Sequence, residues 1–152
     1  NVSDKNVVNV TSSSVYSNLY AKNAVDLDNN DSCFISGNNP GSWLQYDFKN
    51  RKVRPICYLI KSARWGKGDW HPKNWVIEGS NSCASYDWTV LDTRNNVTSL
   101  DDRNAVQIFS IQKSNEFYRY LRIRQTGCNC SSDSSSQNHL MLSALEFFGP
   151  IQ

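Results

Sequence analysis

The sequence has little of what several protein classes require. Its 152 residues contain no apolar run near the roughly 18–20 residues that a membrane-spanning helix needs. Two histidines are present, too few to complete an ordinary structural zinc site with the scattered cysteines. The net charge is only +2, whereas nucleic-acid-binding domains concentrate many basic side chains on one face. We therefore expect no membrane span, no zinc site and no nucleic-acid partner.

The cysteines do not form the even set of a disulfide-stapled secreted domain. There are five of them: Cys33, Cys57, Cys83, Cys128 and Cys130. The N-terminal residues also lack a basic-then-apolar signal peptide, although a processed chain would look the same. The cysteine count favours a reducing, intracellular (cytoplasmic) location. A secreted or cell-surface location is the alternative.

Alternation of apolar and polar residues is the dominant pattern, and helical periodicity is absent. A hydrophobic content of 39% excludes disorder, and the length suits a single domain spanning residues 1–152. About eight strands separated by polar connections predict an all-β fold, a single antiparallel β-sandwich of the jelly-roll type. The expected strands are residues 7–11, 43–48, 54–63, 74–80, 88–91, 105–111, 117–125 and 140–148.

Three connections differ from the rest in length and content. Residues 24–42 are acidic and then rich in glycine and asparagine, and residues 126–139 are small and polar. Residues 64–74 carry two tryptophans, a histidine and three basic side chains. Because alternate connections of a jelly roll emerge at the same end, these loops are expected to share a rim, where binding residues usually lie.

Five segments, taken in order, resemble the discoidin family, also called coagulation factor V/VIII type C domains. The resemblance implies a galactose-binding-like jelly roll over nearly the whole chain. The segments are Asn23–Asp26, Ser42–Phe48, Trp75–Asn81 followed by Trp88, Tyr118–Arg124 and Leu142–Gly149.

Two further features place this resemblance within the family. Extracellular members commonly join their first and last residues by a disulfide, but here the end is Gly149-Pro150-Ile151-Gln152. The stretch His71–Trp75, together with Gln125–Gly127 and the ending Ala144–Gly149, looks most like an intracellular branch found in BTB-domain and ubiquitin-ligase-type proteins. The resemblance therefore implies an intracellular interaction module.

The connection that begins at residue 64 is the predicted ligand site. Trp65 and Trp70 offer flat apolar faces, beside which Arg64, Lys67 and His71 could supply donors. Asn38 and Asn39, in the loop 38–42, are expected to complete the site. The alternative is that one tryptophan packs inward as a plug while the charged groups are simply solvated. In membrane-binding relatives the corresponding loop enters the lipid.

The first long connection predicts a second site. Asp26, Asp31 and Ser32, together with Glu146 of the last strand, supply the hard oxygen ligands that calcium prefers. The resemblance also implies a structural calcium ion here, because many carbohydrate-binding relatives hold one between this loop and the last strand. The alternative is a metal-free loop of Asx turns, since Asp26-Leu27 replaces the usual Asp-Gly turn. No other cofactor is expected.

Catalysis has little support in the sequence. No serine lies in a Gly-x-Ser-x-Gly elbow, and no histidine motif provides a metal pair. We therefore predict a non-enzymatic binding module that recognises a protein segment within an intracellular assembly. The alternative is a lectin-like domain for galactose-type glycans, and the third hypothesis is attachment to anionic phospholipid surfaces. Ligand identity and oligomeric state are left open.

Overall fold

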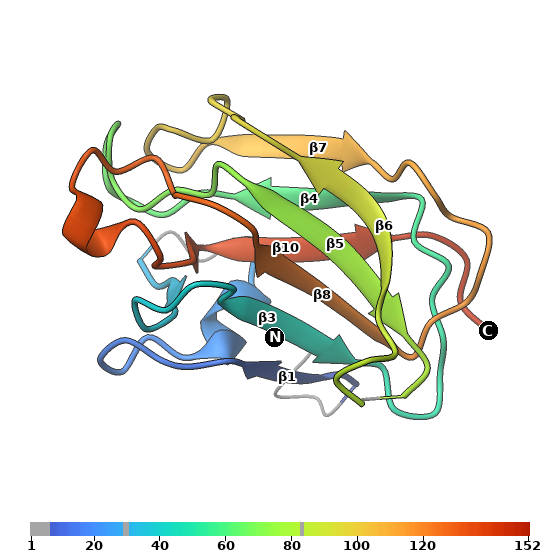
Figure 1. The fold of residues 1–152 in the computed structure, drawn as a ribbon. Helices are drawn as coiled ribbons and strands as arrows, with labels where there is room; N and C mark the ends of the chain where they lie inside the picture. The colour runs from blue at the N-terminus through green and yellow to red at the C-terminus, as the bar shows by residue number, and fades with distance from the viewer. Residues whose placement is uncertain (1–6, 29–30, 83) are drawn as a thin grey trace.

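The computed structural model describes residues 7–28, 31–82 and 84–152, which form two facing antiparallel sheets (Figure 1). The larger sheet has five strands in the order β1-β3-β8-β5-β6. Apolar and basic residues alternate along β8 and show which face of the sheet is buried. Leu121 and Ile123 are fully buried, while Arg122 and Arg124 point to the outer face. The strands are β1 (Asn9–Ser12), β3 (Trp43–Asp47), β5 (Trp75–Ser80), β6 (Thr89–Arg94) and β8 (Tyr120–Gln125).

The second layer is a three-stranded sheet in the order β10-β4-β7. Its central strand β4 is buried along most of its length, as its continuous apolar sequence predicts. A two-stranded ribbon and two short 3-10 helices, η1 (Ala21–Ala24) and η2 (Ser134–Ser136), complete the described elements. The sheet contains β4 (Cys57–Lys61), β7 (Val106–Ser110) and β10 (Ala144–Phe148), and the ribbon contains β2 (Phe34–Ile35) and β9 (Met141–Leu142).

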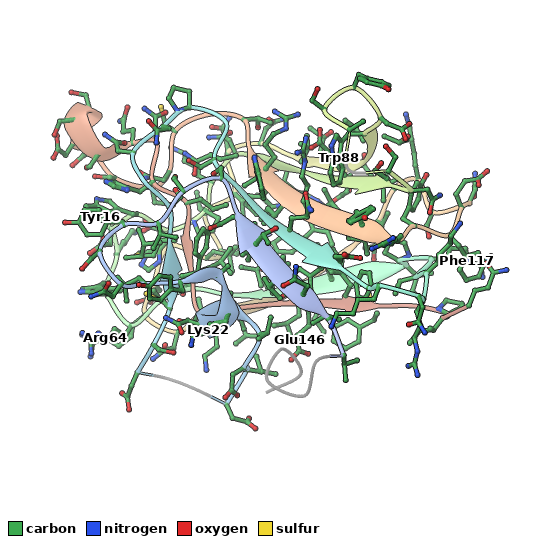
Figure 2. All side chains as sticks on the ribbon, turned by 90° about the horizontal axis from the view of Figure 1, so that it is seen from below. Tyr16, Lys22, Arg64, Trp88, Phe117 and Glu146 are labelled. Atoms are coloured by element: carbon green, nitrogen blue, oxygen red, sulfur yellow. The ribbon has the colours of Figure 1, made fainter. Side chains whose placement is uncertain are left out.

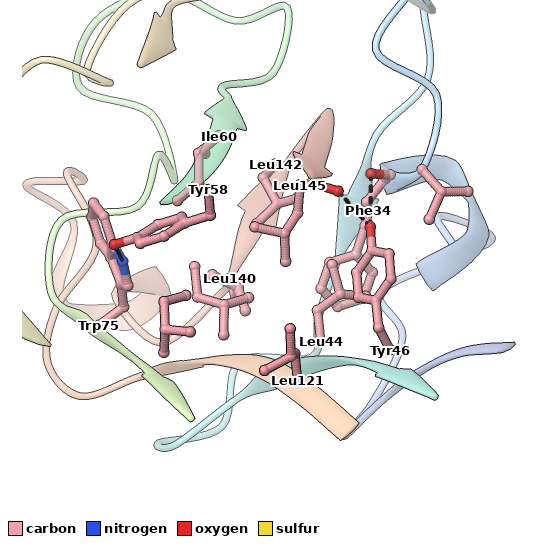
Figure 3. Close-up of a cluster of buried hydrophobic side chains, with 14 of the residues drawn as sticks. Phe34, Leu44, Tyr46, Tyr58, Ile60, Trp75, Leu121, Leu140, Leu142 and Leu145 are labelled. Atoms are coloured by element: carbon pink, nitrogen blue, oxygen red, sulfur yellow. Dashed lines mark hydrogen bonds between the residues drawn. The ribbon is translucent and has the colours of Figure 1, made fainter. Parts of the chain in front are cut away.

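The core lies between the two sheets and contains three aromatic side chains whose polar atoms are bonded (Figure 3). The Trp75 indole donates to the Tyr58 hydroxyl at 2.9 Å, and Tyr58 in turn donates to Asp92 at 2.7 Å. The Tyr46 hydroxyl donates to the Leu145 carbonyl at 2.6 Å, which ties the large sheet to the small one. Aliphatic residues such as Leu44 fill the space between them, each contributing about 1.5–3 kcal/mol of burial energy.

The predicted all-β antiparallel jelly roll is confirmed, with two differences in its strands. Among the described residues there are ten strands, because β2 lies inside the connection 24–42 and Ser143 divides the last predicted strand into β9 and β10. The four described cysteines are free thiols, and the fifth, Cys83, lies outside the described residues. No helix in the described part of the chain is long and apolar enough to cross a membrane.

Candidate functional site

The long connections gather at one end of the sandwich, which we call the loop end. It comprises the segments that leave β1, β4, β6 and β8 and the segment that enters β3, at the left of Figure 1. Backbone and side-chain hydrogen bonds join these loops. The Gly68 amide donates to Asp101 at 2.7 Å, and the Cys130 amide donates to the His71 carbonyl at 3.0 Å. The shared rim predicted for the jelly roll is therefore present.

Both predicted tryptophans of this end lie partly inside the protein. Trp65 and Trp70 pack, with Leu19, against a small second core made of Cys33, Ile35, Ala63 and Met141. Each indole nevertheless keeps part of its surface exposed. The inward-packing alternative is thus correct for part of each ring, and the loop end has its own hydrophobic support instead of projecting freely.

An aromatic stack brings three loops together at this support. The Trp70 indole lies on the His139 imidazole, with ring centroids 4.0 Å apart and planes inclined by only 15°. Tyr16 meets both rings edge-on, at 5.5 Å from Trp70 and 5.1 Å from His139. His139 itself is buried and its Nδ1 lies 2.8 Å from the Ser36 carbonyl. Tyr16 is 45% exposed, so it presents an aromatic surface to solvent.

The prediction that His71 donates to a ligand is wrong. Its side chain is fully buried, and its Nε2 lies 3.1 Å from the Trp65 carbonyl and 3.0 Å from the Gly66 carbonyl. These loop carbonyls have no strand partner, and a buried imidazole N–H satisfies both of them. His71 therefore stabilises the loop by hydrogen bonds from inside the protein. Its other nitrogen, Nδ1, is buried without a hydrogen-bond partner within the described residues.

The two basic side chains of the predicted site are exposed. The Arg64 guanidinium lies 5.0 Å from the Trp65 ring centroid, a distance at which a cation–π interaction orients it. Burial raises the pKa of the Cys33 thiol beneath the loop to about 11, and the nearby Arg64 charge only partly opposes this shift. Within the described ranges neither Arg64 nor Lys67 forms an ion pair with a carboxylate. Both charges are therefore available to a ligand.

The two asparagines of the predicted site differ in what they already bind. The Asn38 amide is used on both sides, donating to the Ser135 carbonyl at 2.6 Å and accepting from the Asn138 amide at 2.9 Å. It fastens the 36–42 loop to the 126–140 loop. Asn39 is exposed, and its carbonyl accepts from the Ser42 hydroxyl at 2.7 Å. Of the two, Asn39 has the freer side chain.

The acidic loop forms an Asx turn, and the predicted calcium ligands do not converge. The Asp28 amide donates to the Asp26 carboxylate at 3.2 Å. Asp31 is exposed, and Ser32 and Glu146 are partly buried. Burial and then the charge of Asp28 raise the pKa of Glu146. In residues 7–28, 31–82 and 84–152, no three histidine, cysteine or acidic side chains are placed to hold a metal ion.

Sequence reasoning missed Tyr16 and His139. Tyr16 lies in a polar segment, Ser12-Ser13-Ser14-Val15-Tyr16, whose pattern predicts neither a strand nor a binding loop. His139 ends a low-complexity connection and directly precedes the buried run at Leu140. That junction of a polar loop with an apolar run was the one available signal that His139 is buried.

Comparisons with known proteins find similarity in structure only. No protein-family model matches the sequence, and no curated protein matches it. The family resemblance of the five segments is thus supported through the fold alone.

Several solved structures share this fold at low sequence identity. A family 32 carbohydrate-binding module (CBM) from a family 31 glycoside hydrolase of Clostridium perfringens has a TM-score of 0.71 at 15% identity, covering 97% of this chain and 94% of that one. The family 32 CBM of C. perfringens NanJ, solved with galactose, has a TM-score of 0.69 at 10% identity, covering 97% and 96%. A fucose-binding module of Streptococcus pneumoniae has a TM-score of 0.67 at 17% identity, covering 93% and 91%. These matches confirm the antiparallel β-sandwich jelly-roll fold.

Proposed function

We propose that this chain is a non-catalytic glycan-binding module whose binding surface is the loop end. The observation that carries the proposal is the preformed aromatic stack of Tyr16, Trp70 and His139, with the Arg64 cation nearby, which forms no ion pair among the described residues. Figure 2 shows Tyr16 and Arg64 at the same end of the molecule. An apolar ring face beside directional donors is the combination that receives a sugar ring and orients its hydroxyl groups.

The rigidity of the loop end supports this proposal. Gly68, at φ +81°, adopts a left-handed conformation that disfavours other residues, and its amide is fixed by Asp101. His71 and Asn38 hold the neighbouring loops by further hydrogen bonds. A site whose side chains are already ordered loses less entropy on binding, which matters for small polar ligands with few apolar atoms. The fold is shared with structures described as binding galactose and fucose.

The decisive experiment screens the chain on an immobilised glycan array and measures each positive sugar by calorimetry. We expect binding to a galactose- or fucose-containing glycan. Tyr16→Ala removes an exposed ring without touching the main core, and we expect it to weaken that binding about tenfold, or ~1.4 kcal/mol. Tyr86→Ala is the matched control, because Tyr86 is 91% exposed in the 81–88 segment at the opposite end.

Two results would contradict the proposal. The first is the absence of binding to any glycan on the array. The second is binding that Tyr86→Ala weakens and Tyr16→Ala does not. Recognition of a protein segment in an intracellular assembly, and attachment to anionic lipid, would use the same surface and stay predictions. Binding of the chain to anionic vesicles, or to a peptide, in the absence of glycan binding would favour them.

A further inference from the structure

A buried lysine lies beneath the acidic loop. Lys61, the last residue of β4, is 7% exposed and stands directly opposite Ala144 of β10. Its ammonium group donates to the Leu27 carbonyl at 2.8 Å. Burying a charged ammonium group costs free energy unless acceptors replace the lost water. The hydrogen bond to the Leu27 carbonyl provides such an acceptor.

The loop above Lys61 is strongly negative. Three carboxylates, those of Asp26, Asp28 and Asp31, lie within six positions of one another. The loop begins at Val25, which forms a β-bridge with Ala144, so its start is attached to the same strand that Lys61 faces. A fourth carboxylate, Glu146, is near enough for the charge of Asp28 to raise its pKa, after the larger effect of burial. The carboxylates repel one another, and a positive charge nearby reduces that repulsion.

Calcium does not fit this arrangement. It takes six to eight oxygen ligands, with carboxylates among them. Asp26, Asp31 and Glu146 are not gathered around one point, and the Leu27 carbonyl already accepts from an ammonium group. A divalent ion at that carbonyl would meet the like charge of Lys61 at short range. The ammonium group, by contrast, carries three donors suited to carbonyl oxygens.

We propose that Lys61 supplies, from within the chain, the positive charge that holds the acidic loop on the sheet, so that the fold is independent of calcium. The loop leads directly into Cys33 and Ile35, which pack beneath Trp65 and Trp70. Lys61 thus supports the loop end from below. The proposal does not depend on which ligand the loop end binds.

The test measures thermal unfolding of the whole chain with and without calcium. For the wild type we expect the same Tm in excess EDTA and in millimolar calcium chloride. Lys61→Met keeps the aliphatic stem and removes the charge, so we expect Tm to fall by roughly 4–10 °C. Hydrogen exchange at the amides of residues 26–28 should become faster in that variant. Lys52→Met is the matched control on an exposed lysine and should leave both readouts unchanged.

Either of two results would overturn the proposal. A wild-type Tm that calcium raises and EDTA lowers would show that a metal ion holds the loop. A Lys61→Met variant with unaltered Tm and unaltered exchange at residues 26–28 would show that the ammonium group is dispensable. Because the methionine side chain fits the space of the lysine stem, the variant is expected to fold.

Discussion

Two surfaces of this molecule use tryptophan and arginine together, and they use them differently. On the outer face of the five-stranded sheet, the Arg122 guanidinium lies 3.9 Å from the Trp88 ring centroid. Arg122 and Arg124 both bind the carboxylate of Glu78, each at 2.7 Å, and Glu78 is only 3% exposed. Each charged side chain of this network therefore has an oppositely charged partner inside the protein.

At the loop end the same residue types form no such network among the described residues. Arg64 lies over Trp65 at 5.0 Å but has no carboxylate partner among the described residues. The ring of Trp70 rests on His139, and Tyr16 stays exposed beside it. Figure 2 shows Trp88 away from Tyr16 and Arg64. A cationic aromatic pair is available to a ligand only where the protein has not already neutralised its charge.

The sheet network should carry stability and no binding. Glu78→Gln removes the carboxylate that two guanidinium groups share, and we expect a loss of about 2–3 kcal/mol in the free energy of unfolding. The value lies below that of a fully buried pair because both arginines are partly exposed. Urea unfolding measures it. A loss below about 0.5 kcal/mol would mean that the network contributes no more stability than an ordinary surface ion pair.

Acid should weaken the sheet network selectively. Burial opposes ionisation of Glu78, but the hydrogen bonds from Arg124 and Arg122 outweigh it and hold the pKa of Glu78 below its ordinary value. An acid with a lowered folded-state pKa contributes stability that is present above its ordinary value of 4.5 and is lost as the pH falls through the folded-state value.

Thermal unfolding between about pH 5 and about pH 2 checks this expectation. The wild type should lose Tm over that range, and Glu78→Gln should lose less, because its side chain does not titrate. The pKa of Asp47 is also lowered, chiefly by the hydrogen bond from Arg119. Asp47 is present in both proteins, so it contributes equally to their loss of Tm in acid. If Tm fell with pH by the same amount in the two proteins, Glu78 would not be a source of the acid sensitivity.

The loop end should show the converse behaviour. Arg64→Gln is expected to weaken binding of the array-identified glycan by about fivefold, or ~1 kcal/mol, by removing a charged donor. Because Arg64 is exposed and lacks an ion pair in the described part of the chain, the free energy of unfolding should change by less than about 0.5 kcal/mol. Calorimetry and urea unfolding measure the two quantities. Arg119→Gln, at the sheet pair with Asp47, is the control and should leave glycan affinity unchanged.

The strands could be predicted because the pattern of apolar residues along each segment matches the burial of its side chains. Residues Trp43–Asp47 alternate between partly buried and buried positions, as the apolar alternation predicts, and β4 is covered on both faces. The two-residue strand β2 could not be predicted, since two residues carry no period. Its pairing with β9 depends on a contact across more than a hundred positions of the chain.

The candidate site could be predicted from the sequence only as a location, and ligand binding there stays a prediction. The tryptophans and basic residues of the loop that begins at residue 64 do lie at the loop end, but the role of each side chain depends on how the loops close. His71 is buried because the Trp65 and Gly66 carbonyls need a donor, and nothing in the local sequence reveals that need. Tyr16 reaches Trp70 from a segment more than fifty positions away.

The five tryptophans allow one measurement to test the contrast between the two surfaces. Their indole N–H signals can be followed separately by NMR during titration with galactose and then with fucose, and Trp70→Phe assigns the Trp70 signal. We expect the Trp70 and Trp65 signals to shift, while those of Trp43, Trp88 and the buried Trp75 do not. Shifts confined to Trp43 and Trp88, or no shift at saturating concentrations of either sugar, would contradict this expectation.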